Sequence, residues 1–140
     1  MNRRALFLLP LLATAARAHS LKVGDIKIGH AWALPTTLSE GQVFFPLFNS
    51  GKAPDSLIAA RSDSAATIEL RANNRYDDPP LGSFELAPLK PFAMRPTAHH
   101  LRLIGLRKPL MQGDSFILVA DFTNAGEVEI VVNVETAPGD

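Results

Sequence analysis

Apolar and polar residues alternate at 26–32, 115–122 and 128–134, with the period of two expected of strands that bury one face. No window of a dozen residues keeps a helical apolar period without Pro or Gly. The pattern predicts short strands at 26–32, 43–48, 57–60, 66–70, 83–86, 101–104, 115–122 and 128–134. The inward faces of the last two strands are predicted to carry Phe116, Leu118, Ala120 and Phe122, and Val128, Ile130, Val132 and Val134.

Turn signals separate these strands, and the polar stretch 73–80, which ends in Pro-Pro, is expected to be a loop. Pro46 interrupts the run 43–48, which indicates an edge position or a bulge there. The chain has one domain's length and no dividing linker. We therefore expect an all-β fold, a single-domain antiparallel Greek-key β-sandwich, with a closed barrel as the alternative.

The first eighteen residues follow a different pattern. Arg3 and Arg4 precede an apolar run at 5–13, and Ala16-Arg17-Ala18 supplies a small-x-small cleavage site. These features are typical of a secretory signal peptide, and the run is too short to span a bilayer; an N-terminal membrane anchor is the alternative. We expect export to the periplasm without stable membrane insertion. The expected division is a cleaved signal peptide at 1–18, the β-sandwich at 19–135 and a frayed tail at 136–140.

Composition restricts the chemistry. The 14 basic and 14 acidic residues of the 140-residue chain cancel, and removal of residues 1–18 takes away three arginines, which leaves a mildly acidic mature protein. A nucleic-acid partner is therefore not expected. The sequence has no Cys, so a disulfide, a thiolate metal site and a lipidated cysteine are excluded. No motif marks a nucleophile or a phosphate loop, and we expect no enzymatic activity.

Histidines are the remaining candidate ligands, and strand parity assigns them to faces. His99 shares a face with Leu101 and Leu103, which predicts that His99 points into the core and that His100 points to solvent beside Arg102. By the same argument His30 lies on the apolar face of the strand 26–32, where it is expected to be a core or edge histidine.

Several segments together resemble the PCu(A)C family of periplasmic copper chaperones. They are Trp32, the strand 41–49 with Gly51, the segment Pro54-Asp55-Ser56-Leu57, Ile68-Glu69-Leu70, the block from His100 to Leu110, and Gly113-Asp114 with Phe116. The resemblance covers nearly all of the mature chain. It implies a cupredoxin-like sandwich that carries copper, as Cu(I) or Cu(II), toward a copper-acceptor protein in cytochrome oxidase assembly.

The metal motif of that family is incomplete in this chain. The resemblance implies a His where Arg71 stands, a Met in the loop near Asp78, a His at His100 and a Met where Arg102 stands. Only His100 carries over. Two of the replacements are cations in place of the soft ligands that suit Cu(I).

Two other ligand sets remain open. Signal-peptide cleavage would leave His19 first, so that its α-amine and imidazole could chelate one copper ion, with His30, His99 or His100 completing the site. The second set combines His100 with His99 and Met94. The candidate metal ligands are thus His100, His19 and His99, and the alternative function is a metal-free interaction module that has lost copper binding.

Overall fold

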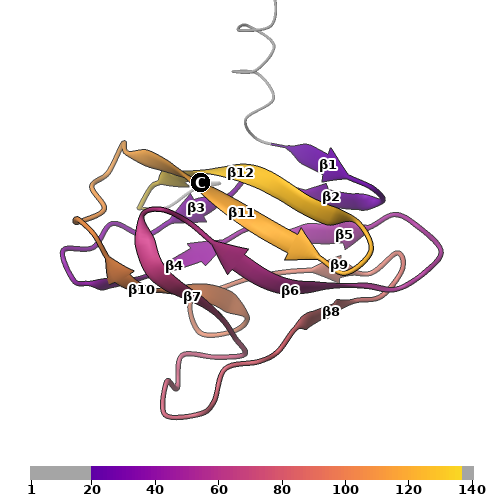
Figure 1. The fold of residues 1–140 in the computed structure, drawn as a ribbon, viewed down its shortest axis with the longest axis horizontal. Coiled ribbons are helices and arrows are strands. Elements are labelled where there is room, and N and C mark those ends of the chain that lie inside the picture. The colour runs from indigo at the N-terminus through magenta and orange to yellow at the C-terminus, as the bar shows by residue number, and fades with distance from the viewer. Residues whose placement is uncertain (1–19, 137–140) are drawn as a thin grey trace, which may run out of the picture.

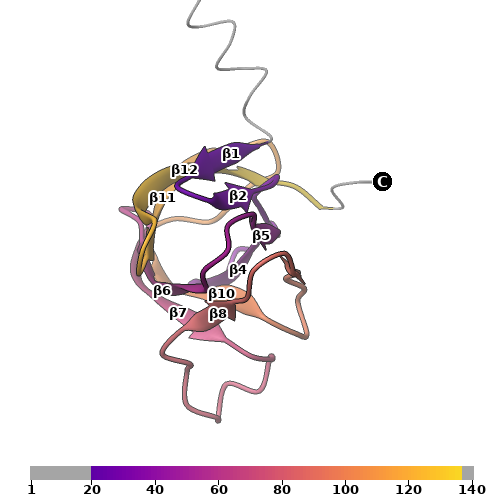
Figure 2. The ribbon, with the colours of Figure 1, turned by 90° about the vertical axis from the view of Figure 1, so that its right-hand side faces the viewer.

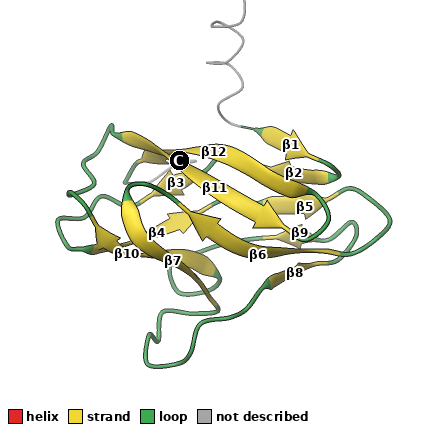
Figure 3. Ribbon diagram, viewed as in Figure 1, coloured by secondary structure: helices red, strands yellow, loops and turns green. Residues whose placement is uncertain are grey.

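The computed structural model describes residues 20–136, and within that range the chain forms strands and no helix (Figure 3). The predicted signal peptide, His19 and residues 137–140 lie outside the described residues. The strands are β1 (Leu21–Val23), β2 (Ile26–Ile28), β3 (Trp32–Ala33), β4 (Glu40–Phe44), β5 (Leu47–Asn49), β6 (Asp55–Arg61), β7 (Ala65–Arg71), β8 (Phe84–Leu86), β9 (Pro91–Phe92), β10 (His100–Leu106), β11 (Ser115–Phe122) and β12 (Gly126–Val134). The described residues contain no helix that could cross a membrane.

The strands form two sheets around one core (Figure 1). The smaller sheet has the order β1-β2-β5-β9, and the larger has the order β7-β10-β4-β3-β12-β11-β6-β8. Strand pairing is antiparallel except between β3 and β12, which run parallel. The larger sheet curves around the core, and β6 and β7, near its opposite ends, follow one another along the chain (Figure 2). The predicted β-sandwich is confirmed, with a large sheet curved toward the barrel that was the alternative.

The core is built by the alternation that the sequence predicted. Leu118, Ala120 and Phe122 of β11 are buried, as are Ile130, Val132 and Val134 of β12, while Phe116 and Val128 are half-buried. Full burial of each large side chain contributes about 1.5–3 kcal/mol. These two long paired strands form the wall on which the shorter strands pack.

Two predicted strands are each divided between the sheets. The segment 26–32 forms β2 in the smaller sheet and then β3 in the larger one, and the segment 43–48 forms β4 and then β5 in the opposite order. The expectation of one continuous strand at 26–32 is therefore wrong. Both segments pass from one sheet to the other side by side. Residues 29–31 connect β2 to β3, and residues 45–46 connect β4 to β5.

The crossing is fixed by contact between Gly29 and Pro46. The Gly29 amide donates a hydrogen bond of 2.9 Å to the Pro46 carbonyl. A Cβ on Gly29 would lie 2.5 Å from Cγ of the Pro46 ring, so only glycine lets the two backbones approach this closely. The residue after Gly29 is His30, and the crossing therefore determines where this histidine lies.

Replacement of Gly29 by Ala is expected to lower the free energy of unfolding by about 1–3 kcal/mol, because the new methyl group meets a rigid proline ring. Urea denaturation measures this as a lower midpoint with an unchanged slope. Gly82→Ala is the matched control, since a Cβ there meets nothing within 4 Å. Equal midpoints for the two variants would contradict the account.

Candidate metal centre

His100 is the first residue of β10, and its side chain is completely buried. The prediction that it points to solvent is wrong. The alternation of side chains along β10 placed His100 on the face opposite Leu101 and Leu103. The loop between β7 and β8 covers that face with Tyr76, whose ring centroid lies 5.8 Å from that of His100. A long polar loop that folds back over a sheet leaves no periodic signal in the strand that it covers.

His99 and Met94 do not join His100 in one cluster. His99 precedes the strand and is half-buried, with its ring 5.2 Å from that of Phe84 and 4.9 Å from that of Phe92. Met94 belongs to the hydrophobic core. His99 was expected to point into the core. It is only half-buried, and it packs against two aromatic rings.

Both ring nitrogens of His100 are engaged in hydrogen bonds. Nδ1 lies 2.8 Å from the carbonyl oxygen of Ala98, which can only accept, so we assign the proton to Nδ1. Nε2 then accepts from the Tyr76 hydroxyl at 2.8 Å, and the Gln42 side-chain amide lies 3.2 Å away. Gln42 also donates to Tyr76 Oη at 2.9 Å and to the Pro96 carbonyl at 3.1 Å. The network is satisfied when the imidazole is neutral.

The surroundings of His100 keep it neutral. Burial lowers the pKa of His100 below its ordinary value, and the positive charges of Arg71 and Arg102 and the neighbouring His99 lower it further. The hydrogen bond to Ala98 acts in the opposite direction, because it favours the protonated ring.

Arg71 lies directly opposite His100 in the β7–β10 pair and is itself buried. Its guanidinium donates to the carbonyl oxygen of Asp78 at 2.7 Å and to that of Tyr76 at 3.2 Å, and its Nε lies 3.2 Å from Oε1 of Glu69. The arginine thus ties the loop that carries Tyr76 to the sheet.

Arg102 closes the other side of the cluster. It pairs with Oε1 of Glu40 at 2.7 Å and lies 3.5 Å from Oε1 of Glu69, and its guanidinium sits 4.0 Å from the centre of the Tyr76 ring. Cation–π contact of this kind stabilises a partly buried cation. Two carboxylates and two guanidinium groups leave the cluster close to neutral.

The positions that the family resemblance assigns to a copper motif therefore meet in space, but as a closed ion-pair and hydrogen-bond network. Arg71, the Asp78 loop, His100 and Arg102 surround one point, yet no thioether is among them and the lone pair of His100 Nε2 is occupied. The described residues hold no group of three His, Cys, Asp or Glu side chains placed to bind a metal ion. Without rearrangement, this cluster does not fit copper.

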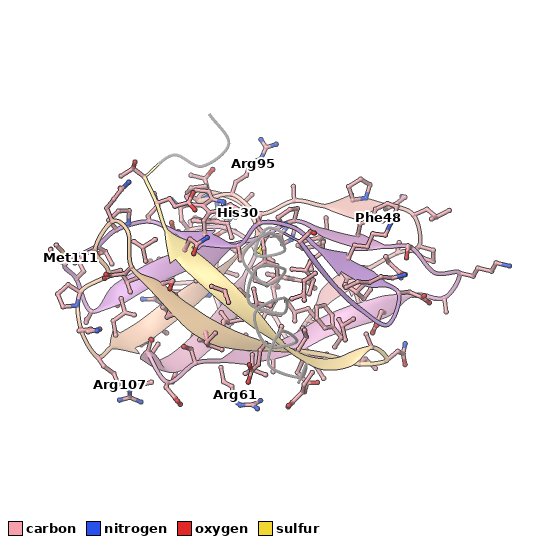
Figure 4. The ribbon with its side chains drawn as sticks, turned by 90° about the horizontal axis from the view of Figure 1, so that it is seen from above. His30, Phe48, Arg61, Arg95, Arg107 and Met111 are labelled. Carbon is pink, nitrogen blue, oxygen red and sulfur yellow. The ribbon has the colours of Figure 1, made fainter. Side chains whose placement is uncertain are left out.

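His30 lies in a different place, in the crossing between β2 and β3 (Figure 4). Its Nε2 is 2.7 Å from Oε2 of Glu135, the residue that follows β12, and the two side chains are 26% and 29% exposed. The β1–β2 hairpin pairs Leu21 with Ile28. Ser20, the first described residue, is therefore next to Gly29, and the two line the same groove.

A protein-family model matches nearly all of the described residues. The model of the LpqE-like family of lipoproteins matches residues 26–134. The chain belongs to the LpqE-like family. A comparison with curated proteins gives no match.

Solved structures relate this LpqE-like chain to PCuAC domains and confirm the resemblance seen in the sequence. The copper-bound PCuAC domain from PmoF2 is 27% identical, with a TM-score of 0.76 over 85% of this chain and 99% of that one. The apo PmoF2 PCuAC domain is also 27% identical, with a TM-score of 0.73 over 86% and 98%. The solution structure of CuI-DR1885 from Deinococcus radiodurans is 17% identical, with a TM-score of 0.58 over 91% and 87%, and shares the fold.

Sequence reasoning missed Tyr76, Gln42 and Glu135. Tyr76 is the sole tyrosine of the chain and the one aromatic residue in a polar loop, which is a signal that it packs against something. Gln42 and Glu135 carry no such signal, because their roles depend on which strands are neighbours.

Tyr76→Phe is expected to lower the free energy of unfolding by about 1–3 kcal/mol, because it leaves Nε2 of the buried His100 without its hydroxyl donor. Chemical denaturation measures the loss. In a His100→Leu background, where no ring nitrogen needs a partner, the same change should cost much less. An equal cost in both backgrounds would show that the hydroxyl acts elsewhere.

Acid is expected to destabilise the fold through His100. Since its pKa is lowered in the folded state, the unfolded chain binds the proton more readily, and this contribution to stability falls as the pH drops below about 6.5. The free energy of unfolding between pH 7 and pH 5 should decline more steeply for the wild type than for His100→Leu. Parallel profiles would contradict the assignment of a neutral, buried imidazole.

Proposed function

We propose that the protein is an exported, chaperone-like copper-binding protein with an altered ligand set. The family match and the 27% identical copper-bound PCuAC domain support copper as the metal that it carries. Export follows from the predicted signal peptide. The family relationship also supports a non-catalytic role, with the copper ion as cargo for an acceptor protein.

The proposed copper site is at the mature N-terminus, with His19 and His30 as ligands. The observation that carries it is the β1–β2 register, which pairs Leu21 with Ile28 and so leads to Ser20 beside Gly29. Residues opposite one another in an antiparallel pair have Cα atoms about 4.5–5.5 Å apart, and successive Cα atoms are about 3.8 Å apart. These spacings support His30, one residue beyond Gly29, as the second histidine of the proposed site.

The ligand chemistry suits copper without sulfur. Cleavage after Ala18 would create a free α-amine on His19, which can chelate the ion together with the imidazole of the same residue. The imidazole of His30 would supply a third nitrogen. Nitrogen ligands of this kind favour Cu(II), whereas thioethers favour Cu(I). Binding therefore depends on the free terminus.

His99 and His100 are less suited to be ligands. For His100 Nε2 to reach a metal, the Tyr76 hydroxyl must leave, and the metal would then lie beside two guanidinium groups. His99 would have to leave its aromatic neighbours Phe84 and Phe92. Each change breaks contacts that the described structure holds.

A protein that carries copper needs a partner protein that receives the ion. The sequence resemblance implies that this acceptor takes part in cytochrome oxidase assembly. No nucleic-acid partner and no stable membrane insertion are proposed. The second candidate function is a metal-free interaction module. It is favoured by the closed state of the His100 cluster, in which the ring nitrogens are already satisfied.

Mature protein that begins at His19 is expected to bind Cu(II) at least about 100-fold more tightly than a version with one extra residue before His19, because the extra residue removes the chelating amine. Competition titration against a chelator of known affinity measures this. His30→Gln should also weaken Cu(II) binding, whereas the matched control His99→Gln should not.

Two results would overturn this proposal. Equal affinity of the extended and authentic proteins would contradict the N-terminal site. Failure of the authentic protein to bind either Cu(I) or Cu(II) more tightly than micromolar would favour the metal-free module.

A further inference from the structure

The outer face of the smaller sheet carries a row of side chains that is charged at one end and apolar at the other. Lys22 of β1 lies opposite Lys27 of β2. Lys27 in turn lies opposite Phe48 of β5, which lies opposite Pro91 of β9. Opposite residues project from the same face, so the row crosses the sheet from β1 to β9, in the order that Figure 1 shows. Both neighbours of Lys27 in β2 are buried in the core, and the row therefore faces away from the core.

The two lysines at the β1 end of the row have no anionic partner. Both residues are exposed, and none of the salt bridges among residues 20–136 includes a lysine. Like charges directly opposite one another in an antiparallel pair repel and weaken the pairing. The mature chain is expected to be mildly acidic, yet this end of the sheet presents two adjacent positive charges. The pair is therefore suited to hold an anion.

The row lines a groove between the smaller sheet and β12. Its apolar lining includes Pro46, Phe48, Pro91 and Val131, and Glu129 is the single acidic residue among the described residues that line it. The groove has a volume of about 1030 Å³, near the upper end of the range for ligand pockets, about 300–1,000 Å³. Neighbouring strands lie about 4.8 Å apart, so the row spans about 14 Å, the length of an extended alkyl chain of about a dozen carbons.

We propose that this groove binds a single-chain amphipathic anion, a long-chain carboxylate. The head group lies at Lys22 and Lys27, because a carboxylate supplies the charge that the lysine pair lacks. The alkyl chain lies along Phe48 and Pro91, where its contact removes apolar surface from water. A groove encloses one chain between the smaller sheet and β12, whereas a bilayer surface would contact only its rim. The ligand differs from copper, and the inference does not depend on copper binding.

The experiment uses the metal-free protein and laurate below its micelle concentration, with affinity measured by isothermal titration calorimetry. Lys27→Gln is compared with Lys108→Gln, which removes the same charge from an exposed lysine that follows β10, outside the groove. Dodecyltrimethylammonium, which has a similar chain and the opposite charge, is the control for the head group. Decanoate, which is shorter than laurate by two methylene groups, tests burial of the chain. A nitroxide at the methyl end of the chain reports where the tail lies.

We expect Lys27→Gln to weaken laurate binding by about 3–5-fold, and Lys108→Gln to leave it unchanged. Decanoate should bind about tenfold more weakly than laurate, because two fewer methylene groups are buried. Dodecyltrimethylammonium should bind more weakly still. The nitroxide should broaden the amide signals of Phe48 and Phe92 more than those of Lys22 and Lys27.

Four results would overturn the proposal. They are equal weakening by the two lysine variants, equal affinity for the cationic detergent, nitroxide broadening centred on another face, and no measurable binding of laurate. If the protein fails to bind laurate but binds phosphatidylglycerol vesicles or poly-glutamate, the lysine face recognises a membrane surface or an acidic protein segment instead of a single chain.

Discussion

The close approach of Gly29 to Pro46 is the constraint on which the arrangement of this molecule depends. Two segments leave one sheet for the other at this level, and the distance between them admits no side chain on residue 29. Because β2 ends at Ile28 and β3 begins at Trp32 in the larger sheet, His30 lies between the two sheets rather than within a strand. The same crossing brings β3 beside the end of β12, which places Glu135 against His30.

The second organising feature is the closed cluster around His100. Related PCuAC domains include a copper-bound one, and this chain keeps their fold together with one histidine of the implied motif. In the described structure that histidine accepts a hydrogen bond from Tyr76 and lies opposite a buried arginine. Burial of Arg71 is tolerable because carbonyl oxygens and Glu69 surround its guanidinium. The cluster holds the loop between β7 and β8 against the sheet. A metal ion would have to displace these contacts in order to bind there.

Much of the fold could be predicted from the sequence, because burial of one strand face imposes a period of two. The inward residues of β11 and β12 followed from that pattern alone. The division of 26–32 into two strands could not be predicted, because it depends on a contact with Pro46, seventeen positions along the chain. The orientation of His100 was predicted wrongly for a similar reason: parity gives the face of a strand, not what a distant loop lays over that face. His30 was identified as a histidine at a core or edge position, but its pairing with Glu135 requires the parallel β3–β12 contact.

We propose that copper binds beside the crossing, at the mature terminus and His30, and not at the His100 cluster. The most direct test is the map of paramagnetic broadening that Cu(II) causes in the nuclear magnetic resonance spectrum of the mature protein. We expect sub-stoichiometric Cu(II) to broaden the signals of residues 20, 29–31 and 135 first and to leave those of Tyr76 and residues 98–102 sharp. Broadening centred on Tyr76 and His100 would contradict it.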